Sequence, residues 1–599
     1  MKLKKKGFTQ TLKKATAGVL AASMMLTPIN VMAAEVAEMF ETTRAVALER
    51  ALDLMEMFDV PGVTMSLVDA DSGYTWTQGL GYADAVQGTA VTEDTLFSIG
   101  STAKTFTAVA IMQLVEAGLL DLDEPIITYL PEFSMLPNPI YGGDYRNITA
   151  RMLLNHTSGI HELLNEQYID FNGGGQDRER MNNLFSLMPN LHMKNQELNN
   201  ETYNNTGYAL LGILVARLMG AENYYDGFVD FTQENIFYPS GMTSSSFEIT
   251  AENRPNIALP HLDAETAAED FYYVHTTSGG GMVSNAVDMA RFMHIMLNGG
   301  RYGSDEDTRI LNSASIDEMI AVENLDFEQG ISMGLGLMYR RHASGAVSMG
   351  HAGGLQHHTD MFLDFENGIG VFVSVNSTSG AALPNLLGEA IWKAAVYEKN
   401  GIPVSLNPYL LYNSDPFIPE SLEELEGWYT LAGQLVLNDE GVLVFPSFQG
   451  SPMDIELTPI GDGFFEPSVS GMDFPAELPN FSFRQENGTM FLFAGATRQG
   501  ERLEPTPAPE SFERWTGRWG TIDEEGNEKL AFTLGIDENG FAHSMRRGVL
   551  PFLEEVVDDY TIVTLGRSRL HGGVRTFSIE DGVPTISYSG EEFVKLEPV

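Results

Sequence analysis

The chain has 599 residues, of which 43% are hydrophobic and 20% charged, so it should form about two to four domains with buried cores and is neither disordered nor fibrous. Its 82 acidic and 35 basic residues give a net charge of −47, which disfavours binding to nucleic acids and other polyanions. Cysteine is absent, which excludes disulfides, thiolate metal ligands and a cysteine nucleophile.

The first 34 residues are typical of a secretory signal peptide. Six lysines and no acidic residue open the chain, an apolar stretch follows over 15–26, and a small residue, Ala33, stands where a signal peptidase cleaves. An N-terminal membrane anchor is the alternative, but the stretch is shorter than the ~20 residues that a membrane span needs. We therefore predict a secreted protein, extracellular or cell-wall associated, with no stable membrane span. The lysine-rich leader and the lack of cysteine suggest a Gram-positive bacterium.

Residues 35–400 should form an α/β (α+β) domain. Apolar residues at helical spacing predict helices over 36–59 and 383–397, and two β-hairpins are predicted over 62–82 and 361–375. The second hairpin turns at Asn-Gly, the strongest short hairpin signal. Because a helix and a hairpin stand at each end, we expect one antiparallel sheet flanked by helices, with a mostly helical lobe inserted between the two hairpins.

The rest of the chain should be all-β. Residues 401–418 are rich in Pro and Asn and are predicted to be a linker. Pro-Glu-Ser occurs at 419 and again 90 residues later at 509, and each copy is followed by a Gly-x-aromatic start and ends in Leu-Glu-Pro. The repeat predicts two β modules, 419–508 and 509–599, built as small antiparallel barrels. One larger β-sandwich is the alternative.

Ser101 and Lys104 form a Ser-x-x-Lys pair ahead of an apolar helix that ends near Gly118. If the helix begins at Ser101, both side chains lie on one face, one turn apart. Burial would lower the pKa of the lysine, so that it could take the serine proton, and the helix N-terminus would favour the resulting alkoxide. An exposed helix start is the alternative, because this pattern arises by chance in a chain of this length.

Two further segments carry candidate site residues. Tyr203 and Asn205 lie in a polar loop before an apolar helix, where a tyrosine can act as a general base and an asparagine can hold an amide or the lysine. His351, Gly353 and Gly354 precede the second hairpin, where a glycine-rich edge strand lets a substrate approach and its N–H can complete an oxyanion hole. The alternatives are a buried tyrosine with a helix cap, and a surface histidine in a glycine turn.

Two other patterns are weaker. Residues 330–334 read Gly-x-Ser-x-Gly, but the strand before it and the helix after it that an α/β-hydrolase needs are not predicted. His357 and His358 are adjacent and point apart in any regular element, and no metal-ligand spacing occurs in the sequence. We interpret the two histidines as loop residues beside the site, and we expect neither a metal nor an organic cofactor.

Taken in order, Ser-x-x-Lys, Tyr-x-Asn and His-x-Gly resemble the serine β-lactamase and penicillin-binding protein family. The class C-like branch, with the D-aminopeptidases and D-alanyl-D-alanine carboxypeptidases, is most similar, because it uses Tyr-x-Asn. The stretches 118–125, 153–160 and 279–284 also look like that family. The resemblance covers about residues 40 to 400, and D-aminopeptidases of this family also carry two C-terminal β-barrels.

The resemblance implies a role for each site residue. Ser101 would be the acylated nucleophile, Lys104 and Tyr203 would share the general-base work, and Asn205 would orient Lys104 and bind the substrate amide. The backbone N–H groups of Ser101 and Gly354 would form the oxyanion hole, with Gly353 beside the substrate.

His351 stands where many members have a lysine in a Lys-Thr-Gly triplet. A histidine that titrates near neutrality supplies charge only conditionally, so we predict that activity depends on pH through His351.

We therefore predict a secreted serine hydrolase that acts through an acyl-enzyme on Ser101. Its substrate would be an amide or ester such as a D-amino-acid peptide, a peptidoglycan fragment or a β-lactam. Two alternatives stay open: an esterase of the same family, and a penicillin- or peptidoglycan-binding or sensing protein without turnover.

Overall fold

The computed structural model covers most of the chain between residues 39 and 596. It describes residues 39–163, 168–170, 178–197, 201–268, 272–274, 277–301, 309–321, 331–341, 347–404, 416–430, 432–446, 454–469, 480–486, 488–494, 497–522, 528–545, 552–566, 571–580, 582–589 and 591–596. The predicted signal peptide at 1–34 and most of the predicted linker at 401–418 lie outside these residues. Within the described part, no helix is both long and apolar enough to cross a bilayer.

The N-terminal domain is built on one eight-stranded antiparallel sheet with the order β3-β2-β1-β12-β11-β10-β9-β8. Its strands are β1 (Gly62–Asp69), β2 (Tyr74–Asp84), β3 (Thr89–Ala90), β8 (Ile331–Met333), β9 (Met338–Arg341), β10 (Val347–Gly354), β11 (His358–Asp364) and β12 (Ile369–Val375). The two predicted hairpins meet at the centre, where β1 pairs with β12 from Val63↔Val375 to Asp69↔Ile369. The sheet assembled from both ends of the domain is thereby confirmed.

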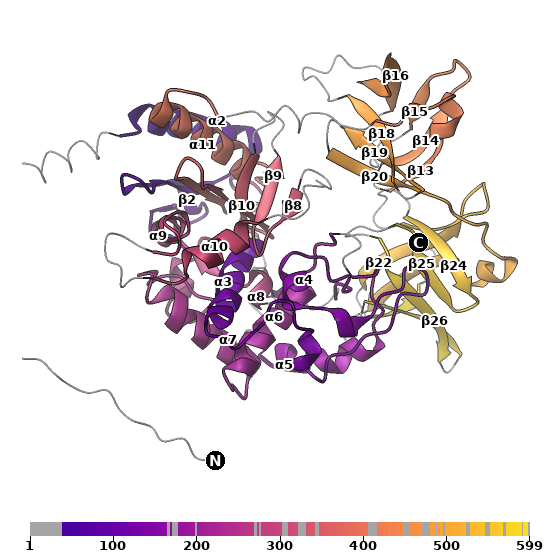
Figure 1. Ribbon diagram of the computed structural model, residues 1–599, viewed down its shortest axis with the longest axis horizontal. Coiled ribbons are helices and arrows are strands. Elements are labelled where there is room, and N and C mark those ends of the chain that lie inside the picture. Colours follow the sequence, from indigo (N-terminus) through magenta and orange to yellow (C-terminus); the bar gives the residue numbers. More distant parts are fainter. Residues whose placement is uncertain are drawn as a thin grey trace, which may run out of the picture.

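Helices cover both faces of this sheet. α2 (Glu41–Phe58) and α11 (Leu383–Asn400) lie side by side over one face, and α9 (Ala286–Leu297) and the helical lobe lie on the other (Figure 1). Every residue of β1 and of β12 is buried, because a central strand covered on both faces has no exposed side.

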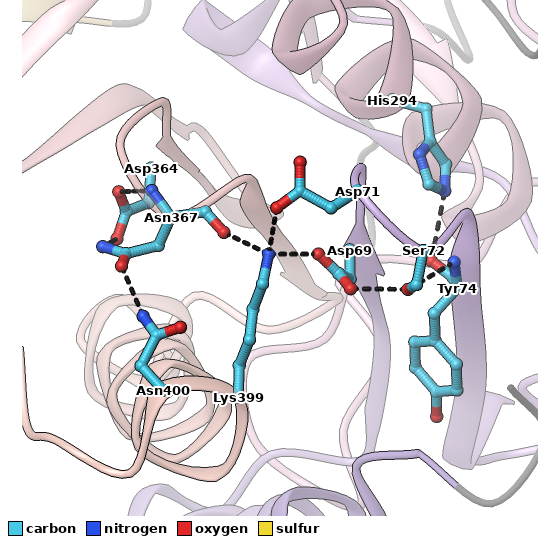
Figure 2. Close-up of polar contacts among 9 residues, drawn as sticks. All are labelled: Asp69, Asp71, Ser72, Tyr74, His294, Asp364, Asn367, Lys399 and Asn400. Atoms are coloured by element: carbon cyan, nitrogen blue, oxygen red, sulfur yellow. Dashed lines mark hydrogen bonds and ion pairs between the residues drawn. The ribbon is translucent and has the colours of Figure 1, made fainter. Parts of the chain in front are cut away.

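A half-buried lysine, Lys399, ties the two ends of this domain together (Figure 2). Lys399, near the end of α11, donates at 2.6 Å to Asp69 and to Asp71 in the first hairpin, and at 2.6 Å to the backbone oxygen of Asn367 in the second. Burial opposes the charge of Lys399, but the hydrogen bonds to the two carboxylates outweigh it and raise the pKa of the ammonium. One cation therefore joins the two hairpin turns to the end of α11.

The lobe between the hairpins is mostly helical, as predicted. Its elements are β4 (Phe97–Ser98), η1 (Gly100–Thr102), α3 (Ala103–Glu116), η2 (Ile126–Thr128), η3 (Tyr145–Asn147), α4 (Ala150–Leu154), β5 (Tyr168–Asp170), α5 (Arg178–Leu187), η5 (Met188–Asn190), α6 (Asn205–Leu218), α7 (Tyr224–Thr232), η6 (Gln233–Phe237), η7 (Arg254–Asn256), β6 (Tyr272–Val274), α8 (Thr277–Gly280), β7 (Val283–Ser284) and α10 (Ser313–Ile320). α3 is buried at eleven of its fourteen positions and contacts α6 and α8, so it is the central helix of the lobe.

The C-terminal region forms two closed eight-stranded antiparallel barrels (Figure 1). Barrel 1 contains η9 (Leu422–Leu425), β13 (Gly427–Tyr429), β14 (Gly433–Leu437), β15 (Leu443–Phe445), β16 (Ile455–Gly461), β17 (Phe464–Val469), β18 (Phe481–Glu486), β19 (Thr489–Ala494) and β20 (Thr497–Leu503). Barrel 2 contains η11 (Glu510–Trp515), β21 (Gly517–Ile522), β22 (Glu528–Ile536), β23 (Ala542–Met545), β24 (Phe552–Asp558), β25 (Thr561–Thr564), β26 (Val574–Glu580), β27 (Val583–Tyr588) and β28 (Glu591–Lys595).

The two barrels confirm the predicted repeat and exclude the single sandwich. In each barrel the strand that opens the repeat pairs with the strand that ends it, as Trp428↔Leu503 and Trp519↔Lys595. The Gly-x-aromatic start of each copy therefore lies in the first strand of a barrel, and the Leu-Glu-Pro end begins at or directly after the last strand. Pairing of these two strands closes each barrel and leaves no free sheet edge.

Candidate active site

Ser101 lies at the start of the central helix of the lobe. The sequence predicted a helix from Ser101, whereas the structure has a 3₁₀ turn, η1, that runs into α3 at Ala103. Gly100 has φ +51°, and a Cβ there would lie 2.8 Å from the Gly354 nitrogen, so only glycine suits this close approach. The turn keeps Ser101 and Lys104 on the same side, one turn apart.

Lys104 is fully buried, and three oxygen atoms lie within hydrogen-bond distance of its side-chain nitrogen. Nζ lies 3.2 Å from Ser101 Oγ and 2.6 Å from Asn205 Oδ1, and it also donates to the backbone oxygen of Gly279. An amide oxygen and a carbonyl oxygen can only accept, so a neutral Lys104 gives its two N–H bonds to Asn205 and Gly279. The nitrogen lone pair then faces Ser101, which alone among these three partners can donate. This geometry suits proton transfer from the serine to the lysine.

The loop before α6 is held by the segment that follows α4. The N-cap of α6 is Asn204, whose Oδ1 accepts from the Gly207 N–H at 2.8 Å and whose Nδ2 donates to the Ile160 carbonyl at 2.7 Å. The Asn204 N–H donates to His156 Nδ1 at 3.1 Å. The cap is thus the residue between Tyr203 and Asn205, and its bonds place those two side chains on either side of it.

Tyr203 lies against the buried lysine. Its ring packs on that of His156 with 4.3 Å between centroids and an interplanar angle of 38°, and its centroid lies 4.9 Å from Lys104 Nζ. Tyr208 lies at a similar 5.2 Å from Nζ, but its hydroxyl donates to the Leu154 carbonyl at 2.8 Å, and burial raises its pKa well above the usual range. Of these two tyrosines, Tyr203 is therefore the candidate for proton transfer.

The glycines of β10 pack directly against the Ser101 turn. A Cβ on Gly353 would overlap the Ile99 carbonyl oxygen and lie 3.0 Å from the Ser101 nitrogen. Gly354 is exposed and lies beside Gly100, as described above. The second half of β10, beyond its pairing with β9, thus lies against the nucleophile turn. The backbone nitrogens of Ser101 and Gly354 are close together there, an arrangement that suits an oxyanion hole.

His351 is fully buried, which corrects the predicted titration near neutrality. Its Nδ1 lies 2.7 Å from the Ala352 carbonyl, and its ring lies 6.3 Å from that of Tyr203. Burial, together with the charge of Lys104, lowers the pKa of His351 to about 3. The imidazole is neutral across the physiological range, so it supplies neither a fixed nor a switchable charge there. The alternative of a surface histidine is also wrong.

Sequence reasoning missed two groups that complete the site. Glu162 accepts from Asn205 Nδ2 at 2.6 Å through Oε1, and the Gly279 carbonyl accepts from Lys104. Glu162 stands two residues after the stretch 153–160, so its position was the only available signal. A backbone carbonyl has no side-chain signal at all.

The remaining candidates are placed outside this constellation. Ser332 lies within β8 and is followed by β9 instead of a helix, so it is not at a nucleophile elbow. His357 lies in the turn after β10, as predicted, and its Nδ1 accepts from the Ser98 N–H at 3.0 Å. His358 is not a loop residue but the first residue of β11. Among the described residues, no three His, Asp or Glu side chains are placed to share a metal ion.

The domain that carries this site is similar to known proteins. The family model described as Beta-lactamase matches residues 53–396, more than half of the chain. Serine beta-lactamase-like protein LACTB, mitochondrial, from Homo sapiens is 38% identical over 118 residues, which is 19% of this chain and 21% of that protein. Penicillin-binding protein 4 of Amycolatopsis lactamdurans is 32% identical over 237 residues, 38% of this chain and 57% of that protein. The chain thus spans less than two thirds of the length of either relative.

Two of the similar solved structures differ in how much of this chain they cover. The D-amino acid amidase of Ochrobactrum anthropi SV3 complexed with L-phenylalanine amide is 24% identical with a TM-score of 0.49, and the match covers 59% of this chain and 98% of the amidase. The octameric penicillin-binding protein homologue from Pyrococcus abyssi is 19% identical with a TM-score of 0.44, and the match covers 92% of this chain and 99% of the homologue.

Proposed function

Because this chain belongs to the beta-lactamase family, a family of serine hydrolases, we propose that it hydrolyses an amide or ester through an acyl-enzyme on Ser101. One observation carries the proposal: Lys104 Nζ lies 3.2 Å from Ser101 Oγ, and its other two partners are pure acceptors. A lysine so surrounded is prepared to receive the serine proton.

The proposed reaction has two halves. In the first, the Ser101 proton moves to Lys104, Oγ bonds to the substrate carbonyl carbon, and the N–H groups of Ser101 and Gly354 bind the oxygen that becomes negative. The carbon–nitrogen or carbon–oxygen bond then breaks, and the leaving group takes a proton from Lys104 or through Tyr203. In the second half, water gives a proton to the same bases and its oxygen bonds to the acyl carbon. The bond between that carbon and Ser101 Oγ then breaks, and the base returns the proton to Oγ.

The neutral His351 supports a substrate without a free carboxylate at this position. A member with a lysine here offers a fixed cation, whereas the pKa of His351, lowered by burial to about 3, leaves this imidazole uncharged. We therefore favour D-amino-acid amides, short esters or internal peptide bonds of wall fragments over peptides with a free C-terminus. The signal-peptide prediction makes an extracellular or wall-bound substrate part of the same proposal.

Labelling of Ser101 tests the proposal. The mature protein and Ser101→Ala are exposed to a fluorescent penicillin and to a fluorophosphonate, and the adduct is read by intact mass. We expect labelling by at least one probe that disappears in the variant, followed by turnover of D-amino-acid amides or short esters. Absence of labelling by both probes would contradict the proposal and favour a binding or sensing protein without turnover.

A further inference from the structure

The last turn of barrel 2 contacts the segment that holds the site. Ser589, between β27 and β28, donates its hydroxyl hydrogen to the Glu162 backbone oxygen, and its Oγ lies 2.9 Å from His161 Nδ1. The ring of Tyr588 meets the ring of His161 edge-on at 5.5 Å. Burial lowers the pKa of His161 to about 3, so the imidazole is neutral. Its Nδ1 lies 2.8 Å from the Glu162 backbone oxygen as well as near Ser589 Oγ, so the histidine, the serine and that oxygen form one hydrogen-bonded cluster.

From Glu162, two successive side-chain hydrogen bonds lead to the lysine beside the nucleophile. Glu162 Oε1 accepts from Asn205 Nδ2 at 2.6 Å, and Asn205 Oδ1 accepts from Lys104 Nζ at 2.6 Å. A carboxylate can only accept, so Glu162 fixes which end of the Asn205 amide faces it. The opposite end, the oxygen, is thereby directed at Lys104. If Glu162 moved, the Asn205 amide could rotate and present its N–H, in place of its oxygen, to Lys104 Nζ.

Barrel 2 is seated by contacts that are independent of Ser589. Asn138 Nδ2 donates to the Gly572 carbonyl at 2.9 Å, and the Gly566 N–H donates to the Tyr141 hydroxyl at 2.7 Å. Gly572 has φ +74°, and a Cβ there would lie 2.6 Å from the Lys194 carbonyl, so the backbones meet closely. The barrel is therefore held against the helical lobe at more than one place, and the Ser589 turn has a defined position.

The Ser589 turn itself is built for this contact. Ser589 is 5% exposed and has φ +57°, a left-handed conformation that glycine would adopt with less strain. The Arg575 guanidinium lies 4.3 Å from the centroid of Tyr588 on the barrel side. Position 589 thus carries a serine hydroxyl although its backbone conformation favours glycine. The ring of the neighbouring Tyr588 is contacted by Arg575 of the same barrel.

We propose that barrel 2 is a positioning element for the nucleophile: Ser589 holds the His161–Glu162 segment, Glu162 orients Asn205, and Asn205 orients Lys104. This inference rests on the proposed function, in which Lys104 activates Ser101. Glu162 and Ser589 are positioning residues, because they act through Asn205 and not on the substrate.

Four variants test the proposal in the full-length mature protein. Ser589→Ala keeps the backbone strain and removes the hydroxyl, Ser589→Gly removes both, and Glu162→Gln removes the acceptor-only carboxylate. Tyr141→Phe is the matched control, because it removes one barrel hydrogen bond that does not touch Glu162. The readouts are the rate of Ser101 labelling by a fluorophosphonate and hydrogen–deuterium exchange of peptides covering 156–163 and 201–208.

We expect both Ser589 variants to slow labelling about five- to tenfold and to speed exchange in the two peptides, with Tyr141→Phe unchanged. Thermal stability should not explain the loss, because Ser589→Gly is expected to be at least as stable as Ser589→Ala. In the Glu162→Gln background, Ser589→Ala should cause no additional loss, since both changes act on one path.

Additive losses, an equal loss in Tyr141→Phe, or unchanged labelling in the Ser589 variants would overturn the proposal. The exchange measurement separates this from failure of the proposed function. If the wild-type protein is not labelled at all, the proposed function fails, and unchanged exchange at 156–163 and 201–208 in Ser589→Ala overturns the positioning role by itself.

Discussion

His357 couples the stability of the N-terminal domain to pH, and we expect His357→Asn to weaken that coupling by about one proton. The imidazole is 2% exposed, and its Nδ1 accepts the Ser98 N–H three residues before the nucleophile. A protonated ring could not accept this bond. Burial, followed by the charges of His358 and His261, lowers the pKa of His357 from 6.5 to about 3. Asparagine retains an acceptor near the same place and does not titrate.

The magnitude follows from the difference between the two states. The unfolded chain takes up a proton as the pH falls through 6.5, whereas the folded chain does not until about pH 3, so stability is full above pH 6.5 and falls below it. Between pH 7.5 and 5.5 this loss is about 1.4 kcal/mol for each such histidine. His161 and His351 have the same lowered pKa of about 3. These three histidines together account for a loss of about 4 kcal/mol, and His294 and His358, whose pKa values burial also lowers, add to it. His357→Asn should therefore lose about 1.4 kcal/mol less than the wild type between pH 7.5 and 5.5.

Urea unfolding at pH 7.5, 6.5 and 5.5, followed by pulse proteolysis with peptide mapping, assigns the transition to the N-terminal domain. The ring resonance that is missing in His357→Asn identifies His357 in an NMR titration, and it should not move over this pH range. The reasoning is refuted if that resonance titrates with a midpoint above pH 5.5, or if the stability difference between the two proteins is the same at all three pH values.

Two further substitutions test the proposed oxyanion hole and the contact of Lys399 with the two hairpins. Gly353→Ala should slow Ser101 labelling about 100-fold, because the added Cβ overlaps a backbone oxygen of the nucleophile turn and must displace β10; labelling within threefold of wild type would contradict this packing. Lys399→Met should lower the free energy of unfolding by about 3 kcal/mol, since it leaves Asp69, at 1% exposure, without its cation. Lys393→Met is the control on the same helix, because it removes a partly exposed i,i+4 pair with Glu389, for which we expect a loss of about 0.3–0.5 kcal/mol. Equal losses in both variants would show that Lys399 contributes no more than a surface charge.

Local patterns predicted much of the fold. The Asn-Gly turn at Asn367 between two apolar runs specifies a hairpin within a few residues, because a tight turn is a property of the nearby backbone. The repeat at 419 and 509 predicted two β modules for the same reason, since each copy carries its own closing strands. Ser101 and Lys104 are three residues apart, so a single turn was enough to place them together.

Other features depend on which distant segments pack together. His351 was expected to titrate near neutrality, but its pKa depends on its burial and on the nearby Lys104, which no local pattern encodes. Tyr203 and Asn205 reach Lys104 because His156 and Ile160 hold the loop from another part of the chain.

The amino-acid sequence by itself determined the family of motifs, the antiparallel sheet made from both ends of the domain and the two β modules, because each depends on short-range backbone preference and on the spacing of side chains. Only the tertiary structure decided the partners of those side chains. Glu162 meets Asn205 across 43 residues, and Ser589 meets Glu162 across 427. Such contacts arise when the whole chain has closed around its cores, since burial and the choice of hydrogen-bond partner are properties of the packed molecule.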